Sequence, residues 1–396
     1  MLLDDVRRTA SGMASRPPRP APMRIVHCLR APVGGLFRHV CDLAVAQHKA
    51  GHKVGIICDS STGGAFDEEN ITRVTPLLAL GLERFAMPRE ISPSDLPLMW
   101  RLTGAVRNLN PNILHTHGSK GGAYGRTVGT LLRASGLRVA RIYSPHGGSL
   151  HYDAATMRGR VYFTLERALA LMTDAFIFVC QFEADAFTSK VGKPKQPTAI
   201  ALNGLRPEEF EPIAEVPDAR DFLFVGTLRD LKGPDVFLQA LAAMRSRNGT
   251  APTAVVVGDG PDKPRYQAMA AELGLADAVA FRDPMPAQAA FRLAHVMVMP
   301  SRNESMPYIA LEAIAAGMPI VATRVGGVPE IFGPDADSLV PPGDASALAD
   351  AMIVARMAPE NARQTAARLK ERVRGLFNVE AMAATVDGVY RQVIAR

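Results

Sequence analysis

The sequence lacks the features that would place the chain in a membrane or in an oxidising compartment. No apolar run reaches the roughly 18 residues that a membrane-spanning helix needs. Residues 1–22 mix acids with bases and contain no apolar core of the signal-peptide type, so we expect a disordered lead-in there. Only 4 cysteines occur, and none of them forms a CxxC pair. Because all lie in or beside apolar runs, we expect reduced thiols in a cytoplasmic protein; they are Cys28, Cys41, Cys58 and Cys180.

Length and charge indicate two domains with different partners. A chain of 396 residues exceeds one ordinary core, and two domains of about 150–200 residues are expected. Residues 1–200 hold 25 Lys and Arg against 15 Asp and Glu, whereas residues 201–396 hold 20 against 24. A basic half suits nucleic acid, an anionic membrane surface or a phosphorylated substrate. An Arg-rich surface that serves only solubility is the alternative.

The order of apolar segments predicts an α/β fold with doubly wound parallel sheets. Short, nearly all-apolar runs such as 23–29, 53–59 and 112–118 alternate with helix-like stretches, as in a parallel sheet covered on both faces. A Pro- and acid-rich stretch interrupts this alternation before a second series begins. We expect two Rossmann-like domains with an interdomain cleft. The expected parts are a lead-in (1–22), a first domain (23–205), a linker (206–220), a second domain (221–375) and a final helix packing back toward the first domain (376–396).

Glycines and cations follow the first predicted strand of the second domain. In VGTLRDLKG, Gly226, Arg229 and Lys232 stand just past the strand end, where such sheets bind ligands. Glycine lets the backbone approach closely, and two cations near a helix N-terminus suit a diphosphate. A plain turn with surface cations is the alternative. In the first domain Gly34 and Gly35 stand between strand and helix, but the pattern is not GxGxxG, which disfavours an NAD site.

Three histidines stand at strand ends of the first domain, in HTHGSKGGAYGR (115–126) and SPHGG (144–148). His115 and His117 are two residues apart and therefore share one face of a strand. A metal site is conceivable, but no carboxylate or third ligand stands nearby in the sequence. A polar pocket for an anionic or sugar ligand is favoured, with His146 best placed because two glycines follow it. An ordinary core histidine is the alternative for each.

Two glutamates, Glu304 and Glu312, lie at the edge of an apolar helix-like segment. The preceding strand ends at Ser301, Pro307 suits the first helical turn, and Gly317 suits the C-terminal stop. Glu304 is therefore expected in the loop above the helix, and Glu312 about two turns away. A carboxylate there can accept hydrogen bonds from two sugar or ribose hydroxyls. The general preference for acids at helix starts is the alternative for Glu304.

The run from Glu304 to Glu312, with GMPIVATRVGGVPEI after it, resembles the E-x7-E signature of retaining glycosyltransferases of family 4, which have the GT-B fold. FVGTLRDLKG, VVVGDGP, LNG (202–204) and the GG pair extend the resemblance over essentially residues 23–396. In that family the second domain holds a nucleotide-sugar donor and the first holds the acceptor. The resemblance implies a retaining, metal-independent hexosyltransferase whose expected donor is a UDP-sugar.

The resemblance gives individual residues expected roles. Glu304 would contact the donor sugar, Glu312 the ribose, Lys232 the diphosphate, and His146 the sugar near the reaction centre. The expected catalytic residues are His146, Glu304 and Lys232. The expected donor-binding residues are Gly34, Gly35, Gly226, Arg229, Lys232, Glu304, Ser305, Met306, Pro307, Tyr308 and Glu312, with backbone amides of residues 305–308 directed at the diphosphate and sugar. No metal is expected, and no cofactor besides the donor as co-substrate.

Two features bear on the acceptor and on the charge at the diphosphate. Many family members have Arg where this chain has Thr227, and we expect Arg229 to supply that charge instead. HTHGSKGGAYGR is similar to an HSKAG segment of members that extend sugars on polyprenyl-diphosphate carriers, which makes His117 and Lys120 the expected acceptor-binding residues. With the basic first half, this implies surface or exopolysaccharide synthesis on a saccharide or lipid-linked acceptor, peripheral attachment to the inner face of the membrane, and no nucleic acid partner.

Two other classes of function stay open. Another GT-B enzyme could use the same donor pocket, but a nucleotide-sugar 2-epimerase needs catalytic carboxylates in the first domain. A phosphorylase needs a cofactor lysine, for which the sequence gives no signal. A non-catalytic subunit of a glycan-assembly complex is disfavoured because Glu304, Glu312 and Lys232 are all present.

Overall fold

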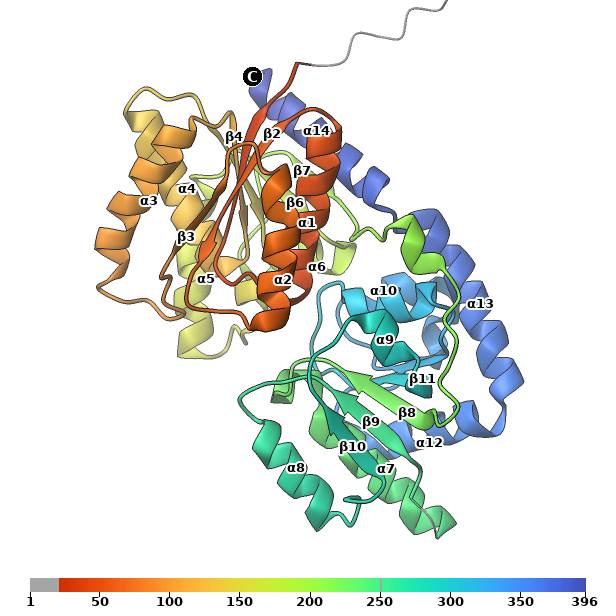
Figure 1. Cartoon of the computed structure of the whole chain (residues 1–396). Coiled ribbons are helices and arrows are strands. Elements are labelled where there is room, and N and C mark those ends of the chain that lie inside the picture. The colour runs from red at the N-terminus through yellow and green to blue at the C-terminus, as the bar shows by residue number, and fades with distance from the viewer. Residues whose placement is uncertain (1–20, 250) are drawn as a thin grey trace, which may run out of the picture.

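A computed structural model of the chain describes residues 21–249 and 251–396, so nearly all of the expected lead-in lies outside the described residues. Two parallel sheets, each with helices against it, form two domains (Figure 1). The chain passes between the domains twice, through an extended connection before β8 and again after α13. The predicted doubly wound two-domain architecture is confirmed.

The first sheet has seven strands in the order β3-β2-β1-β4-β5-β6-β7. Its strands are β1 (Arg24–Leu29), β2 (Lys53–Asp59), β3 (Leu82–Phe85), β4 (Ile113–His117), β5 (Ala140–Ser144), β6 (Ala175–Phe178) and β7 (Thr198–Ile200). Its helices are α1 (Gly34–Lys49), α2 (Ala65–Val74), α3 (Asp95–Leu109), α4 (Ser119–Ala134), α5 (Met157–Ala170) and α6 (Gln181–Lys190), with 3-10 turns η1 (Thr75–Leu77) and η2 (Gly148–His151). The sequence did not predict α2, β3 or α3. The edge strand β3 buries only Phe85 fully, so it lacks the apolar run that marks its neighbours.

The second sheet has five strands in the order β10-β9-β8-β11-β12. Its strands are β8 (Arg220–Val225), β9 (Ala254–Val257), β10 (Val279–Arg282), β11 (Ala294–Met299) and β12 (Ile320–Ala322). Its helices are α7 (Pro234–Asn248), α8 (Lys263–Glu272), α9 (Ala287–Phe291), α10 (Tyr308–Ala315), α11 (Val328–Phe332), α12 (Ala345–Met357) and α13 (Pro359–Leu376), with 3-10 turns η4 (Asp230–Lys232) and η5 (Gly333–Ser338). The connection between the domains contains η3 (Pro207–Phe210).

The last helix, α14 (Val379–Ile394), returns to the first domain, where it is drawn in blue in Figure 1. Met382, Val386 and Tyr390 share one buried cluster with Ile113 and Ile142 of the first sheet. Full burial of one such side chain stabilises the fold by about 1.5–3 kcal/mol, so α14 is part of the first domain's core.

The four cysteines are free, as the sequence predicts; Cys28, Cys58 and Cys180 are buried and Cys41 is half-buried. Burial raises the pKa of the Cys28, Cys41 and Cys58 thiols to about 12, so they are protonated at neutral pH. Among the described residues, no helix combines the length and apolar character that crossing a membrane requires.

The strand orders fix where ligands can bind. In each sheet the chain order reverses at one point, between β1 and β4 and between β8 and β11. The loops that follow two such strands run to opposite faces of the sheet, which leaves a crevice at the carboxyl ends of the strands. Lys232 follows β8, Glu304 follows β11, and His117 ends β4. Residues distant in the sequence therefore meet at these two points.

Candidate functional site

Lys232 and Glu304 lie side by side because β8 and β11 are neighbouring strands. Lys232 Nζ donates to Glu304 Oε1 over 2.6 Å, and Ser301 Oγ donates to the same oxygen over 2.7 Å. Glu304 is 8% exposed and stands four residues before α10 begins. The preference for acids at helix starts therefore does not explain it. The structure presents Glu304 as a positioned carboxylate at the edge of the second sheet.

Glycines allow the loops of this pair to pack closely. Gly326 has a φ of +55°, and a Cβ added there would lie 1.9 Å from the Glu304 carbonyl oxygen. Gly327 N donates to the Ser305 carbonyl oxygen over 2.6 Å. Gly233, at φ +70°, would place a Cβ 2.2 Å from the Pro300 carbonyl oxygen. Any side chain at Gly233 or Gly326 would displace the loops that carry Lys232 and Glu304.

Arg229 precedes Lys232 by three residues and keeps an unused donor. Its Nε is buried and has no hydrogen-bond partner among the described residues, and the guanidinium forms no ion pair there. His151, from η2 of the first domain, lies close by. Burial lowers the pKa of His151, and the charges of Glu304, Lys232 and Arg229 also act on it. The sequence did not single out His151, because it belongs to no motif.

The N-terminus of α10 faces the first domain with its dipole uncompensated, since its first turn contains no acidic residue. Pro307 is the N-cap, with extended φ and ψ of −74° and 117°. The expectation that Pro307 lies in the first turn is therefore wrong by one position. Pro307 also has no amide hydrogen, so it cannot be one of the expected backbone donors. Ser305 Oγ donates to Glu183 over 3.2 Å, and the Met306 carbonyl accepts from Asn203 over 2.8 Å, so both residues contact the first domain.

Glu312 is paired with a cation from the first domain. The Arg38 guanidinium of α1 hydrogen-bonds Glu312, contacts both carboxylate oxygens of Glu209 over 2.6 Å, and lies 3.4 Å from Asp42. It also lies 4.3 Å from the centre of the Tyr308 ring. Burial raises the pKa of Glu312, and the charge of Arg38 opposes that rise. Arg38 and Glu209 were missed in the sequence, because isolated charges in a helix and a linker form no motif.

The two glycine sites differ in how crowded they are. Gly34 has a φ of +63° and opens α1, and a Cβ added at Gly35 would lie 3.3 Å from Tyr308 of α10. The GG loop therefore touches the helix that carries Glu312. At Gly226 an added Cβ would lie 3.6 Å from Phe224, which is ordinary contact. The close packing in this loop is at Gly258, where an added Cβ would lie 2.0 Å from the Gly226 carbonyl oxygen.

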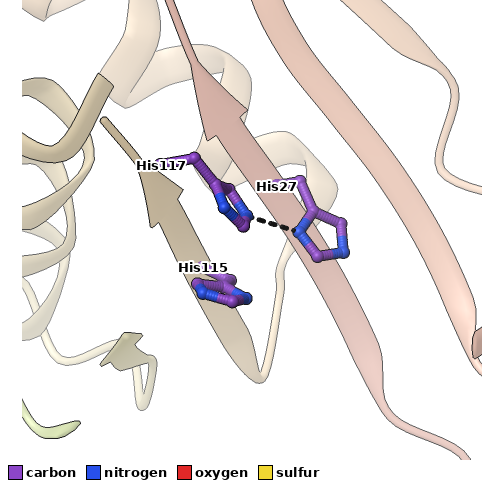
Figure 2. Close-up of side chains that lie close together, drawn as sticks. All are labelled: His27, His115 and His117. Carbon is purple, nitrogen blue, oxygen red and sulfur yellow. Dashed lines mark hydrogen bonds between the residues drawn. The ribbon is translucent and has the colours of Figure 1, made fainter. Parts of the chain in front are cut away.

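A row of histidines lies at the reversal point of the first sheet. His146 has a φ of +50°, and its Nε2 lies 3.0 Å from His117 Nδ1. His117 Nε2 in turn lies 3.0 Å from His27 Nδ1, and His27 Nε2 lies 2.8 Å from Gln47 Oε1. Figure 2 shows the His27–His117 bond with the His115 ring beside it. Burial lowers the pKa of His27 to about 4 and that of His117 and His146 well below 6.5, so these rings are neutral at pH 7.

The two expected acceptor-binding residues have partners within the first domain. His117 is 1% exposed, and both of its nitrogens face other histidines. His117 therefore contacts His146 directly, and its own contact with an acceptor stays a prediction. Lys120 Nζ bonds Asp95 over 2.7 Å and the Glu90 carbonyl over 2.9 Å, and its role as an acceptor ligand stays a prediction.

Comparison with known proteins agrees with this arrangement. Residues 219–355 match the family model described as glycosyl transferases group 1, and residues 33–209 match the model of glycosyltransferase family 4. The chain belongs to the family 4 glycosyltransferases. In this family 4 protein, the two matched segments cover most of the second and first domains respectively.

The curated relatives match over part of their length. The D-inositol 3-phosphate glycosyltransferase of Corynebacterium glutamicum is 34% identical over 181 residues, which are 43% of this chain and 43% of that protein. The protein of the same name from Acidothermus cellulolyticus is 34% identical over 242 residues, 56% of this chain and 52% of that one. The matched stretches span about half or less of these relatives.

Solved structures share the whole fold at low identity. Sucrose-phosphate synthase from Thermosynechococcus elongatus has a TM-score of 0.76 and 22% identity, covering 94% of this chain and 99% of that one. The Anabaena protein HepE, solved with UDP and glucose, has a TM-score of 0.75 and 17% identity, covering 93% and 99%. These likenesses show the fold that the family 4 protein adopts.

Proposed function

We propose that this protein transfers a hexosyl group, with retention, from a nucleotide-diphosphate sugar to a saccharide or lipid-linked acceptor in surface or exopolysaccharide synthesis. The observation that carries the proposal is the Lys232–Glu304 pair beside the unpartnered Arg229 Nε, at the reversal point of the second sheet. A UDP-sugar is the donor we favour, and the likeness to a protein solved with UDP and glucose supports that choice.

The acceptor is expected to carry phosphate. The curated relatives are named for an inositol phosphate, and the similarity to polyprenyl-diphosphate enzymes indicates a lipid diphosphate. Both acceptors place an anion near the reacting hydroxyl, which suits the basic first half of the chain.

The chemistry follows from the charges at the second-sheet site. Negative charge develops on the departing diphosphate, and Lys232, Arg229 and the α10 N-terminus supply positive charge that is already in place. In this proposal the acceptor hydroxyl attacks the anomeric carbon on the side of the leaving group and passes its proton to a departing phosphate oxygen. One C–O bond forms and the C–O bond to phosphate breaks on the same face of the sugar ring, so the configuration is retained. In this proposal Lys232, Arg229 and the α10 N-terminus take the place of a metal on the diphosphate.

One observation favours a second candidate, a nucleotide-sugar epimerase. Glu183 is a buried first-domain carboxyl that accepts from Gly147 N over 2.5 Å and from Ser305 Oγ over 3.2 Å. Burial raises the pKa of Glu183 to about 7, which suits a group that exchanges protons. Donor incubated alone separates the two functions: an epimerase converts it, whereas a transferase only hydrolyses it slowly.

A thermal-shift screen of nucleoside diphosphates tests the donor site. A ligand that binds only the folded protein raises Tm according to its affinity. We expect one nucleotide to raise Tm equally in the wild type and in Lys263→Met, whose amine pairs with exposed Asp283, and to raise it clearly less in Lys232→Met. Glu304→Gln should stay folded and lose transfer. The proposal fails if no nucleotide raises Tm.

A further inference from the structure

The first domain gathers five histidines into two groups of three that share His117. One group is His27, His115 and His117; the other is His39, His117 and His146. Within each group, one ring nitrogen of every residue lies within 4.8 Å of those of the other two. The sequence offered no third ligand near His115 and His117, but β1 lies beside β4 and brings His27, while α1 brings His39.

The inner group, drawn in Figure 2, has no nitrogen to spare. Both nitrogens of His27 are used, by Gln47 and His117. His115 Nδ1 lies 2.6 Å from the Tyr390 hydroxyl, and His115 Nε2 lies 2.9 Å from Ser144 Oγ. These rings form a satisfied core network, and a metal would have to displace several of its hydrogen bonds.

The outer group differs because His39 has a lone pair without a partner. Asn203 Nδ2 donates to the Met306 carbonyl, which can only accept, so the Asn203 amide oxygen faces His39 Nδ1 at 3.0 Å. His39 Nδ1 therefore carries the hydrogen, and Nε2 keeps its lone pair. His39 is 1% exposed, and Nε2 has no partner among the described residues. A buried acceptor in this state costs about 1–3 kcal/mol unless a ligand satisfies it.

The other two rings present nitrogens of the kind that metals bind. His117 and His146 face each other through Nδ1 and Nε2 at 3.0 Å, close to the roughly 3.3 Å that separates two nitrogens on a tetrahedral ion with bonds of about 2.0 Å. His117 Nε2 can donate to His27, and His39 Nδ1 donates to Asn203. Metal-bound histidines commonly have their second nitrogen fixed in this way. The rings of His39 and His146 have centres 4.7 Å apart.

We propose that His39 Nε2, His117 Nδ1 and His146 Nε2 form a binding site for a divalent transition metal such as zinc or cobalt. Imidazole nitrogen suits these ions. A metal on a diphosphate is typically magnesium, which takes oxygen ligands, so the histidine site would bind a different ion. His146 is partly exposed whereas His39 and His117 are buried, so we expect the fourth coordination position on the His146 side. If the proposed function also holds, the ion competes with the donor sugar for His146.

Cobalt binding to the tag-free full chain, without donor, tests this site and does not depend on the proposed function. Equilibrium dialysis should give one Co²⁺ per chain, with the visible absorption of a four-coordinate ion, and excess Zn²⁺ should remove that absorption. His39→Gln and His146→Gln should each weaken binding by more than about tenfold. His295→Gln, an exposed residue paired with Glu215, should leave it unchanged.

Circular dichroism establishes that each variant is folded, and two ligand variants guard against the failure of one. Binding below one ion per chain in the wild type, or undiminished binding in both ligand variants, overturns the proposal. Loss of binding in His295→Gln instead assigns the ion to the surface. If no cobalt binds but His39→Gln alters the affinity for donor sugar, the lone pair receives a substrate hydroxyl and the metal site is rejected.

Discussion

Replacing Arg38 with methionine should destabilise the protein strongly, because Arg38 neutralises carboxylates from three segments. The side chain of Arg38 is 18% exposed, and those of Asp42, Glu209 and Glu312 are 5%, 9% and 18% exposed. In the variant Arg206 is the one cation of the described residues that still pairs with this cluster, 3.7 Å from Asp42 and 3.5 Å from Glu209. Removing one partner of a buried ion pair costs about 3–5 kcal/mol, and we expect a loss in that range at pH 8.

The loss should shrink as the pH falls toward 5. Burial raises the folded-state pKa of Asp42 and Glu312, and Arg38 lowers it again. A raised folded-state pKa means that folding takes up protons, so these carboxyls weaken the fold most at high pH. Without Arg38 the pKa of both rises further, and protonation relieves the unpaired charge in mildly acidic buffer.

Urea unfolding of the wild type and Arg38→Met at pH 5 and pH 8 measures this effect. Arg363→Met is the control, because Arg363 is 68% exposed and lies 3.7 Å from Glu360, a surface pair worth less than about 1 kcal/mol. A loss in Arg38→Met no larger than in the control, or one of equal size at both pH values, would refute the reasoning.

Three further predictions concern the packing and the buried titratable groups of the two domains. Gly326→Ala should lower stability by about 2 kcal/mol or more, because Gly326 has a φ of +55° and the new Cβ would strike the Glu304 carbonyl. The control Gly136→Ala, at a φ of +92° in open space, should cost only about 1–2 kcal/mol. Equal shifts in melting temperature for the two variants would contradict the packing argument. Stability should fall as the pH drops from about 6.5 to about 4, because burial lowers the pKa of His27 and His39 to about 4 and the unfolded chain binds those protons first. Each histidine contributes up to about 3 kcal/mol to this loss of stability. A urea midpoint that does not change over this pH range would exclude the effect. The pKa of Glu183 is raised to about 7, so Glu183 stabilises the fold fully below pH 4.5 and less as the pH rises through 7. The stability of Glu183→Gln should therefore rise relative to that of the wild type between pH 5 and pH 8. A difference in melting temperature that stays constant over this range would count against the prediction.

The Lys232–Glu304 part of the site could be predicted because strand ends are visible in the sequence. Each residue follows an apolar run and a glycine or proline signal, which places it at the carboxyl edge of a parallel sheet. That the two touch depends on the strand order, since β8 and β11 become neighbours only when β9 and β10 lie on the other side. Periodicity carries no information on that order.

The histidine groups and the Arg38 cluster could not be predicted for the same reason. His27 stands 88 positions before His115 in the sequence, yet the two are register partners on β1 and β4. His39 and Arg38 lie in the first helix, where alternating polar residues are ordinary, and their partners Asn203 and Glu209 follow the first sheet. Such contacts require the tertiary arrangement, which single-sequence patterns do not encode.

The measurement that tests the central claim most directly is titration calorimetry of the nucleoside diphosphates into the wild type, Arg229→Met and Lys232→Met. A hydrogen bond to a charged group contributes about 1.5–3 kcal/mol, so loss of either cation should weaken binding by about 10–100-fold. The account predicts one nucleotide bound per wild-type chain and this loss in both variants. Binding of equal strength in all three proteins, or no binding to the wild type, would contradict it.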